Sequence, residues 1–229
     1  RSLGVRFDTS PANDGASTAR CLILVTPDAQ RTLNTFLGAC VELGPDDIDR
    51  AQVEASAVTY LEGYLYDPPH AKEAFHKAEQ IAHAAGRKVA LTLSDSFCVD
   101  RYRDEFRALV EGGADIVFAN EAELLSLYEV DTFDDGLQAI RQHCEVAALT
   151  RSEKGSVIVD HEEVHVIDPA PVEHVVDTTG AGDLYAAGFL YGYTRGEGLA
   201  ECGRLGSLAS AEIISHFGAR PDVALSSLV

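Results

Sequence analysis

The sequence contains no methionine and no tryptophan, and it is short of basic residues. Its 18 lysine and arginine residues face 37 aspartate and glutamate residues, which gives a formal net charge of −19. A nucleic-acid partner is not expected, because contacts with a phosphate backbone need a basic patch. The charge suits a soluble protein that resists association. Since the chain starts at Arg1 and has no methionine, we expect it to be part of a longer protein.

Long apolar runs and paired cysteines are also missing. No apolar stretch is long enough to cross a bilayer and no signal peptide is visible at the start, so we expect no membrane partner. The cysteines are odd in number, widely spaced and without a C-x-x-C pair: Cys21, Cys40, Cys98, Cys144 and Cys202. This pattern is typical of reduced thiols in a cytoplasmic protein, and not of a disulfide or zinc framework.

The segment around which the chain is organised reads D-T-T-G-A-G-D over residues 177–183. Gly180, Ala181 and Gly182 leave the backbone N–H groups open to a ligand. An apolar, helix-like run follows, and a helix start with free N–H groups forms an anion site. Asp183 lies at that same start, where it could act as a base or simply cap the helix. The full string favours a functional site.

From residue 45 onward, expected helices and strands alternate. We predict strands over 57–61, 88–93, 115–119 and 146–150, with helices over 46–55, 68–85, 99–111, 121–128 and 133–143. A hairpin over 156–159 and 164–167, a helix from 184 and a last helix over 201–216 complete the chain. Strands separated by helices of this length indicate a mainly parallel sheet, with ligands beyond the carboxyl ends of the strands.

The first 41 residues have a different character. Residues 4–7 form a short strand candidate, and strands over 19–25 and 31–36 flank a Pro-Asp turn. The pair could be a hairpin over a site or a plain sheet edge.

Two polar segments follow strand ends. Asn120 and Glu123 are spaced as a capping box, and they could equally make a magnesium–phosphate contact. The segment from Thr150 to Gly155 holds a hydroxyl, two cations and a glycine, so it could border a nucleotide or be a surface turn. The residues alone do not decide either case.

Three further carboxylates follow strand ends, and one histidine pair matches a zinc motif. Asp67, Asp95 and Asp100 could line a pocket, but we expect them to cap helices. The H-E-x-x-H string from His161 to His165 requires both histidines on one helical face. Here it crosses a predicted hairpin, so a zinc hydrolase using His161 and His165 is a remote alternative.

Together these motifs resemble the PfkB, or ribokinase-like, carbohydrate kinase family. Residues 177–183 resemble its second signature, Asn120-x-x-Glu123 its N-x-x-E motif, and residues 150–155 its nucleotide loop. The resemblance covers essentially the whole chain. Residues 115–123 and 199–218 are most similar to the adenosine-kinase branch. The implied fold is a ribokinase-like three-layer α/β/α domain over 1–229, with a mainly parallel sheet and a small β lid.

The resemblance also implies a chemistry. Asp183 would take the proton from a primary hydroxyl of a sugar or nucleoside as that hydroxyl attacks the γ-phosphate of ATP. Gly180, Ala181 and Gly182 would form the anion hole for the transferring group. A relative that binds nucleotide or sugar without catalysis is the alternative.

The same resemblance assigns the cofactor side. Asn120 and Glu123 would organise Mg²⁺ and phosphate, often through water, and Thr150 and Gly155 would border the nucleotide. Backbone groups near Asp177 and Thr179, with residues 213–218, would hold a monovalent cation such as K⁺. Residues 1–37 would contribute to the lid, through which we also expect a homodimer.

The sequence departs from the family pattern in two places. Ser152 stands where the family's nucleotide loop usually has its first glycine. The family's N-terminal strand, sugar-binding aspartate and Gly-Gly motif have no counterpart, because residues 1–5 resemble the point just after them. The chain therefore looks like the C-terminal two thirds of a family member, without most of the acceptor-binding residues.

Overall fold

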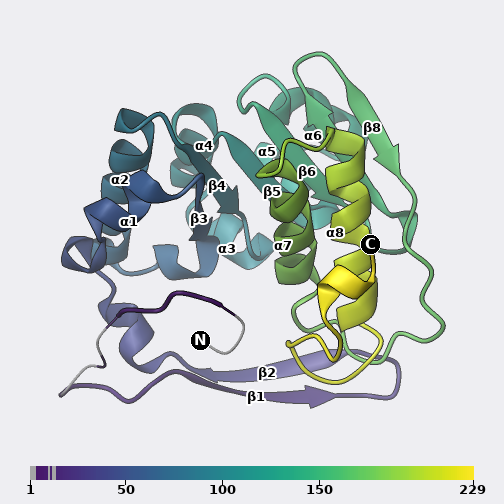
Figure 1. The fold of residues 1–229 in the computed structure, drawn as a ribbon, viewed down its shortest axis with the longest axis horizontal. Coiled ribbons are helices and arrows are strands. Elements are labelled where there is room, and N and C mark those ends of the chain that lie inside the picture. The colour runs from purple at the N-terminus through teal and green to yellow at the C-terminus, as the bar shows by residue number, and fades with distance from the viewer. Residues whose placement is uncertain (1–3, 10, 12–13) are drawn as a thin grey trace.

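A six-stranded sheet forms the centre of the computed structural model, which describes residues 4–9, 11 and 14–229 (Figure 1). The strands lie in sequence order across the sheet. The first four pair in parallel, and the fifth pairs antiparallel with both of its neighbours, so it alone runs in the opposite direction. The strands are β3 (Val58–Glu62), β4 (Lys88–Thr92), β5 (Ile116–Asn120), β6 (Val146–Thr150), β7 (Ser156–Asp160) and β8 (Val164–Ile167).

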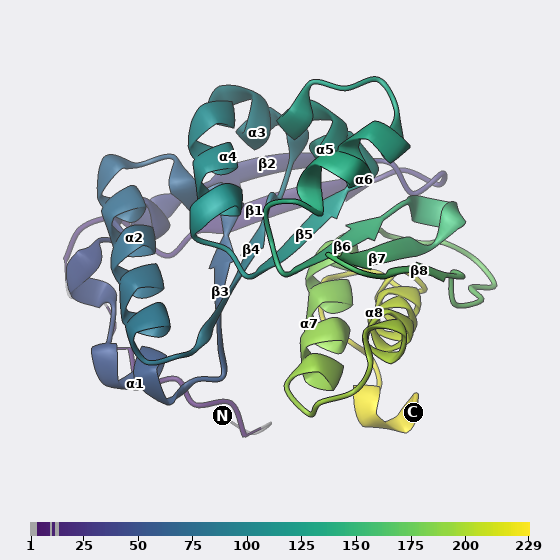
Figure 2. The same cartoon turned by 90° about the horizontal axis from the view of Figure 1, so that it is seen from above.

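Helices cover both faces of this sheet, which confirms the predicted three-layer fold. Figure 2 shows α7 and α8 on one face and the helices α2 to α6 on the other. The covering helices are α1 (Arg50–Ala55), α2 (Pro69–Ala84), α3 (Ser96–Arg101), α4 (Arg103–Gly112), α5 (Glu121–Tyr128), α6 (Phe133–Ile140), α7 (Ala181–Tyr193) and α8 (Leu199–Ile213). Among the described residues, none of the helices is sufficiently long and apolar to cross a membrane.

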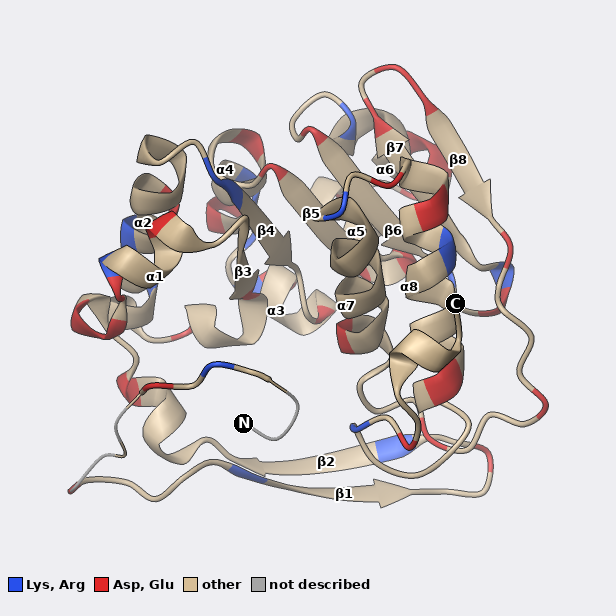
Figure 3. Ribbon diagram, in the orientation of Figure 1, with Lys and Arg blue, Asp and Glu red and all other residues tan. Residues whose placement is uncertain are grey.

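The pleat of the central strands divides the core between the two layers. Val117 of β5 belongs to the cluster beneath α2 to α6, and its neighbours Ile116 and Phe118 belong to the cluster beneath α7 and α8. Four successive β5 residues are therefore buried, as expected for a strand covered on both faces. Acidic positions are spread over both helical layers and are not gathered in one patch (Figure 3).

The predicted hairpin near the start of the chain forms a separate two-stranded sheet. Strands β1 (Arg20–Val25) and β2 (Arg31–Phe36) pair antiparallel around the predicted turn. Figure 1 shows the hairpin running across the end of the main sheet at which the parallel strands terminate. The hairpin thus lies over the expected site and is not an edge of the main sheet.

Several expected elements differ in the structure. Residues 4–7 form no strand, and residues 1–3, which carry part of the resemblance at the chain start, lie outside the described residues. The helix expected over 99–111 is two helices, because Tyr102 leaves helical geometry at φ −129° and ψ 35°. Its hydroxyl donates to Asp67 at 2.7 Å, and the Lys72 Nζ lies 4.0 Å from its ring centre. These tertiary contacts hold the break.

The remaining differences lie at the ends of helices, where turns replace the expected helical residues. The expected helix over 46–55 is a 3-10 turn followed by α1, and the last helix ends at Ile213 instead of 216. The described 3-10 turns are Gly38–Glu42, Pro45–Asp47, Gly63–Tyr66, Ser152–Lys154 and Leu225–Ser227.

Candidate active site

The expected site residues gather where the parallel strands end. Asn120, the last residue of β5, lies beside Thr150, the last residue of β6. Glu62, the last residue of β3, lies beside Thr92 of β4. The fold therefore places these side chains along one edge of the sheet, where α/β proteins bind ligands.

The start of α7 is built to leave its backbone open. Gly180 precedes the helix with φ +82°, a conformation that favours glycine. A Cβ added at Gly182 would meet no atom within 4 Å. The N–H groups of Gly182 and Asp183 have no backbone acceptor among the described residues. Free N–H groups at the positive end of a helix dipole favour an anion, so the anion hole expected here stays a prediction. Of its expected residues, Ala181 already donates its N–H to the Thr178 carbonyl at 3.2 Å.

Asp183 is exposed in the first turn of α7. Its carboxylate accepts no hydrogen bond from the part of the chain that the structure describes, so it is not a capping residue. Its charge acts on the carboxyl end of β3. Burial and, to a smaller degree, the Asp183 charge raise the pKa of Glu62, against a hydrogen bond from Ser94. The unpaired Asp183 carboxylate therefore lies beside the free N–H groups at the start of α7.

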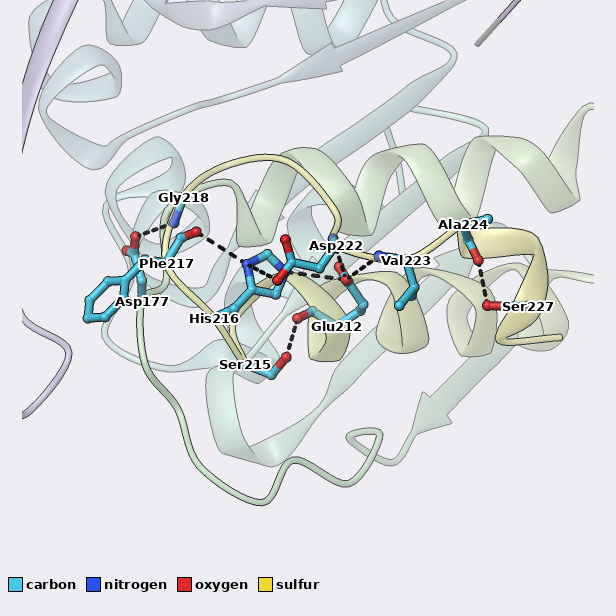
Figure 4. A network of polar contacts seen from close by, with 10 residues as sticks. All are labelled: Asp177, Glu212, Ser215, His216, Phe217, Gly218, Asp222, Val223, Ala224 and Ser227. Atoms are coloured by element: carbon cyan, nitrogen blue, oxygen red, sulfur yellow. Dashed lines mark hydrogen bonds and ion pairs between the residues drawn. The ribbon is translucent and has the colours of Figure 1, made fainter. Parts of the chain in front are cut away.

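Asp177 joins the loop before α7 to the segment after α8. Its Oδ1 accepts from the Thr179 N–H at 2.9 Å and from the Thr179 hydroxyl at 2.6 Å, while Oδ2 accepts from the Gly218 N–H at 3.0 Å. Figure 4 shows the contact between Asp177 and Gly218. Burial alone would raise the pKa of Asp177, but these hydrogen bonds outweigh it and hold that pKa below its ordinary value.

Glu212 anchors the same segment from the end of α8. Its Oε1 accepts from the Asp222 N–H at 2.8 Å and the Val223 N–H at 3.3 Å, and it lies 3.2 Å from the His216 Nε2 (Figure 4). The loop that carries Gly218 is therefore fixed at both ends. Sequence reasoning missed Glu212, because nothing in its local pattern shows that it bonds ten residues ahead.

The capping box at the start of α5 is present in full. The Asn120 Oδ1 accepts from the Glu123 N–H at 2.9 Å, and the Glu123 Oε2 accepts from the Asn120 N–H at 2.9 Å. The Asn120 Nδ2 also donates to the Glu123 Oε1 at 2.6 Å. Glu123 is only 4% exposed, and burial, with the nearby charges of Asp95 and Glu62, raises its pKa to about 7 against the Asn120 bond.

The segment after β6 is a tight turn with two unusual backbone conformations. The Arg151 N–H donates to the Gly155 carbonyl at 2.8 Å. Gly155 has φ +79°, and a Cβ there would lie 2.1 Å from the Ile167 carbonyl oxygen. Ser152 has φ +52°, so it adopts the left-handed conformation for which glycine is better suited. Ser152 therefore replaces the family's usual glycine in sequence but keeps the backbone conformation that glycine favours.

One of the two cations in this turn is already engaged. The Arg151 Nε and Nη2 donate to both carboxylate oxygens of Glu121 at 3.1 and 3.0 Å. Its guanidinium also lies 3.8 Å from the ring centre of Phe133. Arg151 therefore braces the turn against α5 and α6. Lys154 is exposed, with its Nζ 4.0 Å from Glu121.

Sequence reasoning missed the group around Ser94. Ser94 has φ +69°, and its hydroxyl donates to the Glu62 carboxylate and accepts from the Tyr64 N–H at 3.2 Å. Gly63 permits this approach, since a Cβ there would lie 2.7 Å from the Thr92 carbonyl oxygen. These contacts between β3 and β4 are non-local, so no sequence spacing reveals them.

Of the three carboxylates expected to cap helices, one does so and two do not. Asp95 caps α3, as predicted, by accepting from the Phe97 N–H at 2.8 Å. Asp67 and Asp100 are not caps, and that prediction was wrong. Each instead pairs with an arginine, Asp67 with Arg101 at 2.7 Å and Asp100 with Arg103 at 2.6 Å.

The H-E-x-x-H string lies across the β7–β8 hairpin. His161 is in the turn, while His165 lies in β8 opposite Ile158. The His165 Nε2 is 3.1 Å from the Glu163 carboxylate. The two histidines do not share a helical face, which the zinc chemistry of this motif requires.

One charged residue of the hairpin acts on the site. Arg31, exposed at the start of β2, is among the groups that lower the pKa of Asp177. The hairpin therefore brings a positive charge towards the loop before α7.

A mainly parallel sheet covered by helices on both faces, with an open helix start and an unpaired carboxylate at its carboxyl edge, places the chain among the α/β proteins. The chain belongs to the pfkB family of carbohydrate kinases, whose family model matches residues 1–224. This membership confirms the resemblance inferred from the motifs.

Individual relatives agree with the family. The adenosine kinase of Saccharomyces cerevisiae is 29% identical over 230 residues, covering 94% of this chain and 66% of that protein. The crystal structure of adenosine kinase from Sinorhizobium meliloti is 54% identical with a TM-score of 0.96, covering 99% of this chain and 69% of that one. This chain spans between 42% and 66% of the length of three curated relatives.

A more distant structure shares the fold. A putative ribokinase II from E. coli, in complex with ATP and Mg²⁺, is 19% identical with a TM-score of 0.84. The match covers 93% of this chain and 70% of that one. Together these structures confirm the ribokinase-like α/β fold.

Proposed function

We propose that the full-length protein transfers the γ-phosphate of ATP to a primary hydroxyl of a sugar or nucleoside, with Asp183 as general base. The observation that carries this proposal is the exposed, unpaired Asp183 carboxylate beside the open N–H groups of Gly182 and Asp183. Membership of the pfkB family and the likeness to adenosine kinases support it.

The chain's own residues would act by position and electrostatics. Asp183 would accept the proton of the acceptor hydroxyl at a carboxylate oxygen. Within the loop from Gly180 to Gly182 the Ala181 N–H already donates to Thr178, so the N–H groups of Gly180 and Gly182, with that of Asp183, would hold the phosphoryl oxygens at the positive end of α7. Thr150 and Gly155 would border the nucleotide, and Arg31 would bring a further positive charge from the hairpin.

The residues at the end of β5 fit an indirect contact with Mg²⁺. Each carboxylate oxygen of Glu123 accepts one hydrogen bond from Asn120, and the side chain is only 4% exposed, which leaves little room for an ion in direct contact. Among the described ranges, no three His, Cys, Asp or Glu side chains are grouped to hold a metal directly. Asn120 and Glu123 would therefore hold the ion through water. When bound with ATP, Mg²⁺ supplies neutralisation of phosphate charge.

A monovalent cation such as K⁺ would bind between the loop before α7 and the segment after α8. The Asp177 carboxylate is occupied by three donors, so it would act by shaping the loop and not as a direct ligand. The backbone carbonyls of Asp177 and Thr179 and those of residues 213–218 would supply the oxygen ligands.

The hairpin is the proposed lid and pairing surface. On one face of it, Leu22, Leu24 and Phe36 are more than half exposed, an unusual apolar content for an isolated two-stranded sheet. Two copies of the protein would pair through this surface. A cytoplasmic location, as the reduced cysteines suggest, is part of the same proposal.

Replacing Asp183 by asparagine in the full-length protein tests the function. We expect ATP consumption with the best of a panel of nucleosides and sugars to fall by about 10² to 10⁴. Binding of an ATP analogue should stay within about twofold, because Asp183 faces the acceptor. Asp104→Asn, at an exposed acid in α4, is the matched control. Unchanged turnover in Asp183→Asn, or no turnover in the wild type with any acceptor, contradicts the proposal.

A further inference from the structure

A single buried hydrogen bond connects the helix of the proposed base with the proposed nucleotide loop. The hydroxyls of Ser156 and Tyr185 lie 2.6 Å apart, and the two residues are 1% and 4% exposed. Ser156 directly follows Gly155 and begins β7. Tyr185 lies in the first turns of α7, two residues after Asp183.

The tyrosine ring is held on the side of α8. A Cβ added at Gly206 would lie 3.1 Å from two ring atoms of Tyr185 and 2.8 Å from its carbonyl oxygen. At Gly188, an added Cβ would lie 2.4 Å from the Leu205 carbonyl oxygen, so the two helices are in backbone contact. The ring therefore cannot shift unless α7 and α8 move relative to each other.

The serine is held on the side of the sheet. Ser156 pairs with Thr150 of β6 and with Ile167 of β8, so its backbone is fixed in both directions. Gly155, immediately before it, is pressed against the Ile167 carbonyl. Each hydroxyl thus belongs to a rigid element, and the hydrogen bond sets how these elements sit together.

Packing alone does not require this pair of hydroxyls. The surroundings of Tyr185 are apolar, with Ala148, Ile158, Phe189 and Cys202 in the same cluster. A phenylalanine would fill the same space, and a pair of apolar groups of similar shape is close to neutral for stability. Burial raises the pKa of Tyr185 to about 12, so the hydroxyl keeps its proton. A satisfied polar pair in an apolar core specifies one arrangement of its neighbours.

We propose that the Ser156–Tyr185 hydrogen bond positions Asp183 and the open start of α7 relative to the nucleotide loop. This inference rests on the proposed function. In phosphoryl transfer, the base and the phosphate must be aligned closely, and small misplacements cost large factors in rate. Ser156 and Tyr185 are therefore positioning residues, which act through Asp183 and the loop over 150–155 without touching the reacting atoms.

The test compares four variants of the full-length protein with the wild type. Tyr185→Phe and Ser156→Ala each remove one hydroxyl, and the double variant removes both. Tyr193→Phe is the matched control, because Tyr193 lies on the same helix, its hydroxyl makes no hydrogen bond among the described residues, and its ring stacks on Phe189. The measurements are kcat, KM for ATP and acceptor, affinity for an ATP analogue, and the melting temperature.

We expect kcat to fall between about tenfold and 100-fold in Tyr185→Phe and in Ser156→Ala. KM and analogue affinity should change less than about twofold, because binding contacts remain. The double variant should lose no more than the worse single variant, since both remove one contact. Tyr193→Phe should match the wild type.

Three results would overturn the inference. One is a kcat in Tyr185→Phe equal to that in Tyr193→Phe, and another is a double-variant loss equal to the product of the single losses. The third is a lower melting temperature with kcat intact, which would make the pair merely structural. An inactive wild type, or an active Asp183→Asn, would instead contradict the proposed function, so the two failures are distinguishable.

Discussion

The Asp177 carboxylate accepts a hydrogen bond at 3.0 Å from the backbone N–H of Gly218, a residue 41 positions later. This contact, together with the two from Thr179, ties the loop before α7 to the segment after α8. Asp177 is only 3% exposed, and its contacts with Thr179 and Gly218 are partly buried.

Removing this carboxylate should destabilise the protein. In Asp177→Ala the N–H groups of Thr179 and Gly218 lose a charged acceptor in a partly buried contact, at a cost of about 1 to 3 kcal/mol. Urea unfolding at pH 7 would measure the change. The exposed Asp104→Ala is the control and should shift stability by less than about 0.5 kcal/mol. A loss no larger than that of the control would contradict the structural role.

The Asp177 contribution should also depend on pH in a defined direction. Its folded-state pKa lies below the ordinary value of 3.8, so the contribution is present above that value. It disappears as the pH falls through the folded-state pKa. The stability difference between the wild type and Asp177→Ala should therefore be constant from pH 5 to 7 and shrink in stronger acid.

Gly182→Ala should separate stability from activity. A Cβ at this helical position meets no protein atom within 4 Å, and alanine favours a helix over glycine by roughly 0.5 to 1 kcal/mol. The melting temperature should rise slightly while phosphoryl transfer falls, because the methyl group stands where the phosphate would approach.

The control for Gly182→Ala is Gly112→Ala, at the end of α4, where an added Cβ also meets nothing. It should give a similar gain in stability with unchanged turnover. Full activity of Gly182→Ala would show that the phosphoryl group does not approach this backbone.

Glu123 should make the protein less stable as the pH rises. Its folded-state pKa is about 7 against an ordinary 4.5, so its stabilising contribution is complete below pH 4.5 and is lost as the pH rises through 7. The difference of about 2.5 pKa units corresponds to about 3 kcal/mol.

Glu123→Gln should flatten this part of the stability curve. Urea unfolding at pH 5 and pH 8 measures the change. Glu73→Gln, at an exposed acid on α2, serves as the control and should keep the wild-type slope. If Glu123→Gln also keeps that slope, the carboxyl does not titrate in the folded protein near neutral pH.

Ser152→Gly should be tolerated, although it replaces a side chain in the turn after β6. Ser152 has φ +52°, so glycine relieves strain that offsets its greater freedom in the unfolded chain, with a net effect between about 0 and 1 kcal/mol of stabilisation. Ser152→Val should destabilise, because a β-branched residue fits this conformation poorly.

Glu153, at the next position of the same turn, does not have a left-handed backbone conformation. Glu153→Gly should therefore destabilise the protein by about 0.5 to 1 kcal/mol. Chemical denaturation of the three variants compares them directly. A destabilised Ser152→Gly would show that the serine side chain, and not the backbone, sustains the turn.

The sequence predicted the sheet and the open start of α7 because both depend on local pattern. Alternation of helices and strands identified β3 to β6, and the D-T-T-G-A-G-D string located the open start of α7. The capping box of Asn120 and Glu123 is likewise a contact between residues three apart, so its spacing was readable.

What the sequence could not predict depends on contacts between distant segments. The break at Tyr102 is held by Asp67 and Lys72, and the capping role expected of Asp67 failed for the same reason. Ser94, just after β4, bonds to Glu62 at the end of the neighbouring strand β3. Glu212 bonds to the backbone N–H of Asp222, ten residues further along the chain. None of these partners lies at a spacing that local periodicity marks.

The exposed hairpin has a consequence for local opening. No residue of β1 or β2 is fully buried, and a lone two-stranded sheet is only marginally stable in water. Its backbone hydrogens should therefore exchange with solvent much faster than those of β4 to β7, without unfolding of the main sheet. The segment that covers the carboxyl edge should thus detach at a lower free-energy cost than the main sheet, which lets ligands enter and leave while the core stays intact.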